Sequence, residues 1–330
     1  MKLGVLQFFS WPGRRGDLAT VFARAIERIE IMDRTGYDAV WLAEHHFSDF
    51  SVCPSVHMVG TLAAARTTRL RIGTGVSLAP FYHPLRLAEE VALLDILSGG
   101  RVNWGAGRGF ARVEFTAFGV PPGESASRFR EAVEIVLKAW TDERLNFTGK
   151  HFHFEDLEVL PKPLQQPHPP VWVAATSEPA LDWAASRGFS VLMDPHASHR
   201  DIGRKRRFYA ERMAAAGYSV SGRDLPIARL VALADTAEQA EAVARRGAEW
   251  MVASYFGAQH NPVGVKDPTA PGGDPVQRYL DEVILHGTPD AVLDDILRLR
   301  DEIGLDYLLA APLSRTSFTM LTEAVLPRLP

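Results

Sequence analysis

Cysteine is almost absent from this chain of 330 residues, in which Cys53 is the only one. A single cysteine excludes an internal disulfide, a four-cysteine zinc site and an iron–sulfur cage. Scarce cysteine is typical of proteins from a reducing compartment. We therefore expect a cytoplasmic protein in which Cys53 is a buried, unreactive thiol.

Long apolar runs and a strong charge of one sign are also missing. No run of 18 residues is free of charge, so no membrane-spanning helix and no membrane partner are expected. Lys and Arg number 36 against 40 Asp and Glu, which gives a formal net charge of −4. A protein that binds nucleic acid needs a basic surface, so no nucleic-acid partner is expected either.

Short apolar segments alternate with helix-periodic segments along the whole chain. Continuous apolar character is typical of parallel strands that are covered on both faces. The eight predicted strands are residues 3–8, 39–42, 70–74, 102–106, 171–174, 190–193, 227–233 and 307–310. The predicted helices between and after them are residues 18–35, 55–65, 84–97, 127–140, 179–187, 199–216, 237–253, 289–303 and 318–325. Eight strand–helix pairs predict a (β/α)₈ TIM barrel, as a single domain over residues 1–330.

Two connections in this pattern are much longer than the others, which predicts insertions after strands 4 and 7. The first, residues 146–168, contains the alternation Phe152-His153-Phe154, which predicts a small hairpin. The second, residues 254–275, is rich in Gly and Pro. A long loop without periodicity inside a compact domain is often functional, so residues 254–275 are a candidate active-site lid.

Polar residues and glycines, together with Val76 beside Gly75, follow four successive predicted strands. They are Glu44, His45, Gly75, Val76, Gly107, Arg108, Thr176 and Ser177. In a (β/α)₈ barrel the loops after the strands meet at one rim, where the active site lies. The sequence therefore predicts that these residues converge on one functional site.

Each of these signals has two interpretations from the residues alone. His45 is either a catalytic group or a hydrogen-bonded structural residue, and His46 is interpreted as structural. Neighbouring residues on a strand point in opposite directions, so the two histidines are not expected to share a metal ion, and no metal site is predicted.

The glycine-rich segment and the predicted helix start also have two interpretations each. Gly107 and Arg108 precede Phe110, which stands where a dinucleotide-binding fingerprint has its last glycine. They either let a polyanion approach the backbone or form a tight turn with a surface arginine. Thr176 and Ser177 predict a helix N-terminus, which either caps itself or binds phosphate.

Taken in order, several motifs resemble a known family. Residues 35–47, TGYDAVWLAEHHF, resemble the second-strand region of bacterial luciferase. The segments HPLR at 83–86, GRGF at 107–110 and VWVA at 171–174 continue the likeness. The likeness covers most of the chain and is best over residues 1–190. The sequence therefore resembles the luciferase-like, flavin-dependent monooxygenases.

The resemblance implies an activity and its partners. Members of the family are (β/α)₈ barrels that oxygenate small organic substrates with molecular oxygen, through a flavin C(4a)-hydroperoxide. They use reduced FMN as a co-substrate, which a separate flavin reductase supplies. We accordingly expect an FMN-dependent two-component monooxygenase that forms a homodimer.

The resemblance also assigns roles to residues. His45 matches the catalytic base, and Glu44 matches the acid beside the flavin. Gly75 and Val76 match a pair joined by a cis peptide under the flavin ring.

Further matches concern the phosphate end and the subunit interface. Arg108 and Ser177 match ligands of the FMN phosphate, and their neighbours Gly107 and Thr176 are counted with them as cofactor-binding. Gly107 stands where luciferase has a cysteine, and Ala180 replaces a phosphate-contacting threonine. His46 resembles a residue at the subunit interface, where Glu89 is a candidate partner.

Two alternatives remain beside the monooxygenase. A deazaflavin-dependent oxidoreductase would use the same barrel to transfer hydride without oxygen. A non-catalytic, flavin-binding luciferase-like subunit would keep the fold without the reaction. Aldehydes, alkanes, sulfonates and natural-product scaffolds are all substrates within the family.

Overall fold

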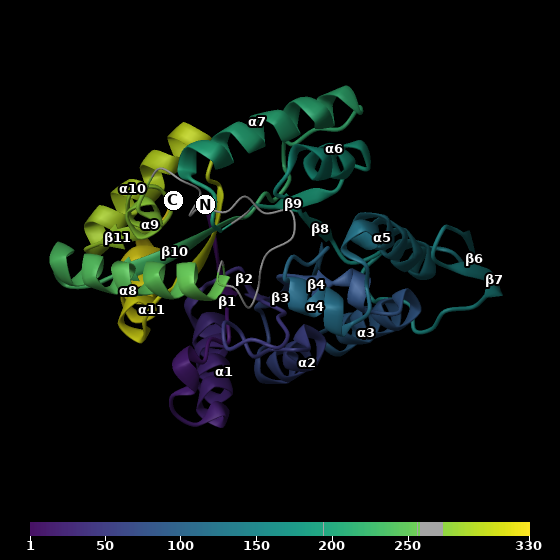
Figure 1. The fold of residues 1–330 in the computed structure, drawn as a ribbon, viewed down its shortest axis with the longest axis horizontal. Coiled ribbons are helices and arrows are strands. Elements are labelled where there is room, and N and C mark those ends of the chain that lie inside the picture. The colour runs from purple at the N-terminus through teal and green to yellow at the C-terminus, as the bar shows by residue number, and fades with distance from the viewer. Residues whose placement is uncertain (194, 256, 258–272) are drawn as a thin grey trace.

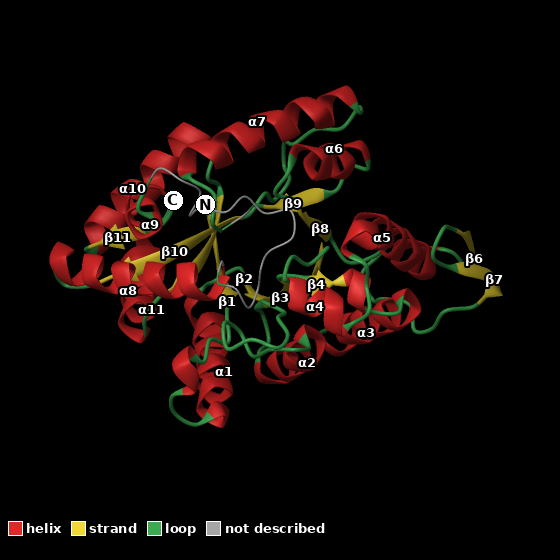
Figure 2. Ribbon diagram, in the orientation of Figure 1, coloured by secondary structure: helices red, strands yellow, loops and turns green. Residues whose placement is uncertain are grey.

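Eight parallel strands close into a ring at the centre of the computed structural model, and the helices lie outside it (Figure 1, Figure 2). The structure describes residues 1–193, 195–255, 257 and 273–330. In ring order the strands are β1 (Lys2–Gln7), β2 (Ala39–Leu42), β3 (Arg71–Thr74), β5 (Val102–Gly107), β8 (Val171–Ala174), β9 (Ser190–Leu192), β10 (Ile227–Leu233) and β12 (Tyr307–Pro312). A parallel bridge between Met193 and Ile227 joins β9 to β10, and β12 pairs with β1. The predicted (β/α)₈ barrel is therefore confirmed.

All the helices expected between the strands are present. The helices are α1 (Leu18–Thr35), α2 (Val56–Arg66), α3 (Pro84–Leu97), α4 (Arg112–Ala117), α5 (Ser125–Thr141), α6 (Glu178–Ser186), α7 (His199–Ala215), α8 (Ala237–Tyr255), α9 (Pro275–Glu282), α10 (Pro289–Ile303) and α11 (Arg315–Met320). A π-helical turn, Leu321–Val325, continues α11 and completes the last expected helix. Within the described residues, no helix is both long enough and apolar enough to cross a bilayer.

The structure also contains elements that the sequence pattern did not predict. These are α4, α9, β4 (Ser77–Leu78), which pairs with β5, and β11 (Leu285–Gly287), which pairs with β10. In the connection after β5, an antiparallel hairpin of β6 (Leu145–Thr148) and β7 (His153–Leu157) projects from one edge of the molecule (Figure 1). Of the candidate lid at 254–275, residues 256 and 258–272 lie outside the described part of the chain.

The interior of the barrel is filled by large aromatic side chains that support the rim. Trp41 is fully buried, and its ring meets Trp172 edge-on at 5.2 Å between ring centroids. Its indole nitrogen donates to the hydroxyl of Tyr307 at 3.3 Å. A Cβ placed on Gly73 would lie 2.3 Å from the Trp41 ring, so only glycine at this position leaves room for it. The interior of the barrel around Trp41 is therefore a packed core and not a pore.

Candidate functional site

A cavity of about 290 Å³ opens at the carboxyl ends of the strands and is called the central cavity below. All eight residues that the sequence placed at this rim line it: Glu44, His45, Gly75, Val76, Gly107, Arg108, Thr176 and Ser177. Four strand ends therefore contribute to one site, although these residues lie far apart in the sequence.

The wall between β3 and β5 is made largely of backbone. The peptide bond between Gly75 and Val76 is cis. A Cβ on Gly107 would lie 2.2 Å from Cγ2 of Val76, so this position admits no side chain while Val76 keeps its place. The two segments thus lie close together and form one side of the cavity.

His45 lies in an aromatic surrounding at the end of β2. The residue is 9% exposed. Its ring stacks on Phe8 at 6.3 Å and meets the edges of Phe50 at 5.0 Å and Phe110 at 5.7 Å. These three aromatic rings pack around the imidazole at the cavity wall.

Glu114 of α4 lies beside this histidine and was not predicted from the sequence. Its Oε1 is 3.9 Å from Nδ1 of His45 and accepts a hydrogen bond of 3.0 Å from the backbone N–H of His46. Burial, the largest cause, raises the pKa of the Glu114 carboxyl to about 7. The group therefore changes charge near neutral pH, close to the imidazole.

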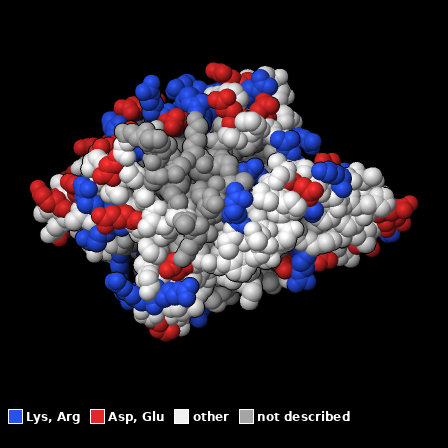
Figure 3. All heavy atoms as spheres, viewed as in Figure 1, with Lys and Arg blue, Asp and Glu red and all other residues white. Residues whose placement is uncertain are grey.

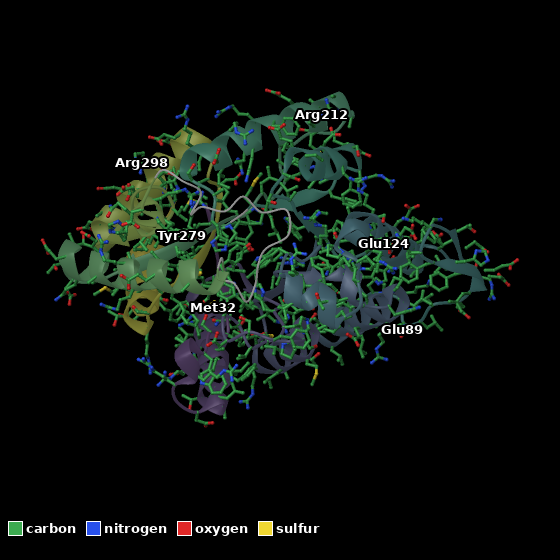
Figure 4. The ribbon with its side chains drawn as sticks, viewed as in Figure 1. Met32, Glu89, Glu124, Arg212, Tyr279 and Arg298 are labelled. Carbon is green, nitrogen blue, oxygen red and sulfur yellow. The ribbon has the colours of Figure 1, made fainter. Side chains whose placement is uncertain are left out.

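Glu44 is buried and holds neighbouring segments together at the cavity wall. Its Oε2 accepts a hydrogen bond from the hydroxyl of Tyr82 at 2.9 Å, and its Oε1 contacts Nε2 of His46 at 3.1 Å. His46 thus has an acid partner within its own chain. Glu89, its expected partner across an interface, lies on the outer edge of α3 (Figure 4).

The opposite end of the cavity is cationic. Arg108 after β5 and Arg130 of α5 both line it, and neither forms an ion pair with a carboxylate within the described residues. The guanidinium of Arg130 lies 5.6 Å from the ring centre of Trp183. Ser177 is the N-cap of α6 but makes no side-chain hydrogen bond to the helix. Two arginines, a hydroxyl and a helix N-terminus therefore surround space that suits an anion.

A third wall comes from the far side of the barrel. His196 lines the cavity, and its Nδ1 lies 2.9 Å from the hydroxyl of Tyr279, a fully buried residue of α9. Tyr255 at the end of α8 packs on His196 at 4.0 Å and on Phe110 at 4.4 Å. This aromatic wall faces the cavity beside His45.

The described part of the chain contains no set of side chains that could bind a metal ion. There, no group of three or more His, Cys, Asp or Glu side chains is placed to hold a metal ion. Cys53 is buried, and burial raises the pKa of its thiol to about 12. The thiol therefore stays protonated at neutral pH, as an unreactive core residue does.

Comparison with known protein families gives a match over nearly the whole chain. The model of the luciferase-like monooxygenases matches residues 1–307. An uncharacterised protein, y4wF, of Sinorhizobium fredii is 31% identical over 313 residues, which cover 92% of this chain and 90% of that protein. The oxygenase component of a flavin-dependent trigonelline monooxygenase from Acinetobacter baylyi is 30% identical over 241 residues, or 72% of this chain and 66% of that one.

Solved structures share the fold over the full length. The monooxygenase RslO1 from Streptomyces bottropensis superposes with a TM-score of 0.84 at 27% identity, over 99% of both chains. The oxygenating constituent of 3,6-diketocamphane monooxygenase from Pseudomonas putida, in complex with FMN, gives 0.81 at 21% identity over 100% of this chain and 99% of that one. An F420-dependent secondary alcohol dehydrogenase gives 0.80 at 18% identity over the same shares. Because the last two structures are only 21% and 18% identical to this chain, they show a shared fold and nothing about function.

Proposed function

The chain belongs to the luciferase-like monooxygenase family, and from that premise we propose that it is an FMN-dependent monooxygenase acting on a small organic substrate. The reaction consumes one molecule of oxygen and one of reduced FMN. One oxygen atom enters the substrate, the other leaves as water, and the two electrons come from the flavin, which is oxidised.

The observation that carries the proposal is the composition of the central cavity. Its cationic end, formed by Arg108, Arg130 and Ser177, has the charge and donors that a phosphate needs. Gly75 and Gly107 both line the cavity, so their peptide groups border it without a side chain of their own, and a flat ring system can lie against them. The residues present therefore fit FMN, with its phosphate at α6 and its ring against β3 and β5.

The remaining residues of the cavity supply proton handling and the exclusion of water. Bound reduced flavin supplies the electrons that activate oxygen. His45 accepts or returns a proton at its imidazole, and Glu114 in its ionised form stabilises the imidazolium from 3.9 Å. The aromatic wall of Phe110 and Tyr255 keeps water from this side of the cavity.

Partners and location follow from the same proposal. Reduced FMN comes from a separate flavin reductase, a division that the name "oxygenase component" of the Acinetobacter relative also implies for that protein. The protein acts in the cytoplasm as a homodimer. Exposed apolar side chains on α2 and α3, among them Met58 and Leu97, support an interface with a second copy.

The test is an oxygen assay on the full chain. Chemically reduced FMN is bound anaerobically, mixed with oxygen, and followed for substrate oxygenation and hydrogen peroxide release over a panel of small organic compounds. We expect at least one compound to be oxygenated while peroxide release falls. His45→Gln should retain flavin binding and lose about 10²–10⁴ in oxygenation rate. Flavin binding without oxygenation of any compound would favour the non-catalytic subunit.

A deazaflavin-dependent oxidoreductase remains the second candidate, because an F420-dependent dehydrogenase shares this barrel over its full length. The same cavity would then hold a deazaflavin, and the reaction would proceed without oxygen. Binding of FMN and F420 to the protein, measured side by side, separates the two. Tighter binding of F420, with hydride transfer under anaerobic conditions, would replace the monooxygenase proposal.

A further inference from the structure

A second and larger cavity, of about 610 Å³, lies beside the central cavity. It is enclosed by α1, α8 and the carboxyl ends of β1 and β12, and is called the basic cavity below. Leu6 and Phe8 of the β1 end line both cavities, so the two are neighbours across these side chains. The basic cavity is therefore at the rim where barrel enzymes bind their substrates.

The basic cavity carries positive charge without compensation. Arg24 and Arg28 of α1 and Arg246 of α8 line it, and its described lining contains no Asp or Glu. None of the three arginines forms an ion pair with a carboxylate in the described part of the chain. By contrast, Arg245, next to Arg246 on α8, pairs with Glu241 at 2.9 Å. Space-filling spheres show basic side chains beside a hollow between α8 and α1 (Figure 3).

Arg28 is held in place before any ligand arrives. Its Nη1 donates to Oε1 of Gln7 at 3.3 Å, and its guanidinium lies 4.9 Å from the ring centre of Phe318. Both contacts use neutral partners, so they orient the guanidinium and leave its charge uncompensated. A guanidinium fixed in this way loses little entropy when it binds an anion, which favours bidentate contact with a carboxylate.

The rest of the basic cavity is mostly apolar. Its apolar lining includes Val21, Val243, Trp250, Met251 and Leu313. A site with cations and an apolar lining suits a molecule that has an anionic end and an apolar body, because each part meets matching groups. An inorganic anion would leave the apolar lining without contacts.

The shared wall connects this site with the proposed chemistry. Phe8, which lines both cavities, stacks on the ring of His45. A molecule whose anionic end lies at the arginines would pass Leu6 and Phe8 with its apolar body and reach the side of the central cavity that holds the imidazole.

We propose that the basic cavity binds the carboxylate of the substrate, so that the substrate class is an organic acid with an apolar alkyl or aryl body. The inference rests on the proposed monooxygenase function, because it assigns the cavity to the substrate of that reaction. Arg24, Arg28 and Arg246 set the specificity for the anion, and the apolar lining selects the body.

Calorimetric binding to the full chain without flavin tests the site itself. The probes are two matched pairs, octanoate with octanamide and 4-phenylbutyrate with 4-phenylbutanamide, together with inorganic phosphate. We expect at least one acid to bind about tenfold or more tightly than its amide, and phosphate to bind more weakly than that acid. Equal affinity of acid and amide in both pairs, or tighter binding of phosphate, would overturn the inference.

Paired variants locate the binding. Arg24→Gln/Arg246→Gln changes two exposed side chains and should abolish the preference for the acid. Arg34→Gln/Arg245→Gln removes the same charge from the same two helices, outside the cavity lining, and should keep that preference. If both double variants lose the preference for the acid, the preference comes from the overall charge of the protein. That result would overturn the proposed anion site.

Oxygen consumption with reduced FMN separates this inference from the proposed function. If acid and amide are oxygenated with the same half-saturation, the monooxygenase stands and the anion site does not serve its substrate. If the acid binds selectively but no compound is oxygenated, the monooxygenase proposal fails, and with it the assignment of the cavity to a substrate. If the acid is oxygenated with at least tenfold lower half-saturation than the amide, and only in chains that keep Arg24 and Arg246, both stand.

Discussion

Arg108 and Arg130 are two cations in the central cavity without a carboxylate partner among the described residues. Cations left uncompensated at a cavity wall favour binding of an anion, because a charge-assisted contact is made without breaking an existing ion pair. The helix N-terminus at Ser177 adds partial positive charge on the same side. The phosphate of FMN is the group that our proposal places there.

Replacing Arg108 by Gln should weaken FMN binding by about 10- to 100-fold, because one charge-assisted contact is lost. Riboflavin has the same ring system without the phosphate, so its affinity should stay nearly unchanged. Flavin fluorescence titrations with both compounds measure the difference. Arg112→Gln, an exposed residue of α4 outside the cavity lining, is the matched control. An equal loss of affinity for riboflavin would place Arg108 elsewhere than at the phosphate.

Glu114 makes folding stability depend on pH. Its pKa is raised by burial from 4.5 to about 7, so the folded chain holds this proton more tightly than the unfolded chain. The stability that the protonated form provides is complete below pH 4.5 and is lost as pH rises through about 7. The shift corresponds to roughly 3 kcal/mol.

Glu114→Gln keeps an oxygen for the His46 N–H and removes the titration. We expect the variant and the unchanged protein to have similar free energies of unfolding at pH 4.5, and the variant to be more stable by up to about 3 kcal/mol at pH 8. Urea denaturation at the two pH values measures the gap. A gap of the same size at both values would contradict a carboxyl that titrates near neutrality.

Helix ends show how local sequence determines an element. Gly36 follows α1 with φ of 98°, in the left-handed region, and an added Cβ would meet nothing within 4 Å. Backbone conformation alone therefore requires glycine at this position. The sequence signal, a glycine directly after a helix-periodic segment, has this physical cause.

Gly36→Ala should lower the free energy of unfolding by about 1 kcal/mol, because the side chain is forced into a left-handed conformation. Gly123→Ala is the control, since its φ is not positive and its Cβ also meets nothing within 4 Å. The control should be neutral or slightly stabilising, because alanine restricts the unfolded chain. Chemical denaturation of both variants measures the contrast, and equal effects would refute it.

Continuous apolar strands and long periodic helices were predictable, and short helices were not. The eight ring strands are mostly continuous apolar runs. The predicted bounds of each strand lie within a few residues of the observed bounds. The helix α9 has only eight residues, and its start signal, Asp274 followed by Pro275, lies at the end of the segment 254–275 that was interpreted as a loop. Short helices contain too few turns for a periodic pattern to emerge, although the cap itself is visible.

Some residues of the candidate site could likewise be predicted from the sequence, and others could not. Residues directly after strands, such as His45 and Arg108, could be placed together because a barrel brings all its strand ends to one rim. Glu114 and Arg130 come from helices that return over this rim, and only the packing of α4 and α5 brings them to the cavity. Their positions follow from tertiary structure, which the local sequence does not encode.

On the scale of the whole molecule, one face remains uncovered by the single chain. Adjacent helices α2 and α3 expose a set of large apolar side chains: Met58, Leu62, Leu93, Ile96 and Leu97. Met58 is 76% exposed and Leu97 55%. Exposed apolar side chains gathered on neighbouring helices are typical of an interface, since isolated surface apolar residues are more scattered. A second copy of the chain is the partner that our proposal assigns to this face.

Leu93→Asp/Leu97→Asp places two charges on that face and should convert the dimer to a monomer, because unpaired carboxylates at a buried interface cost several kcal/mol. Size-exclusion chromatography with light scattering gives the mass directly, with 36.4 kDa for one chain. Leu18→Asp, an exposed leucine on α1, is the control and should leave the dimer intact. A monomeric unchanged protein, or a double variant that remains dimeric, would show that the second copy does not cover α2 and α3. Circular dichroism of the double variant distinguishes a folded monomer, in which the barrel is complete within one chain, from a barrel that needs its partner to fold.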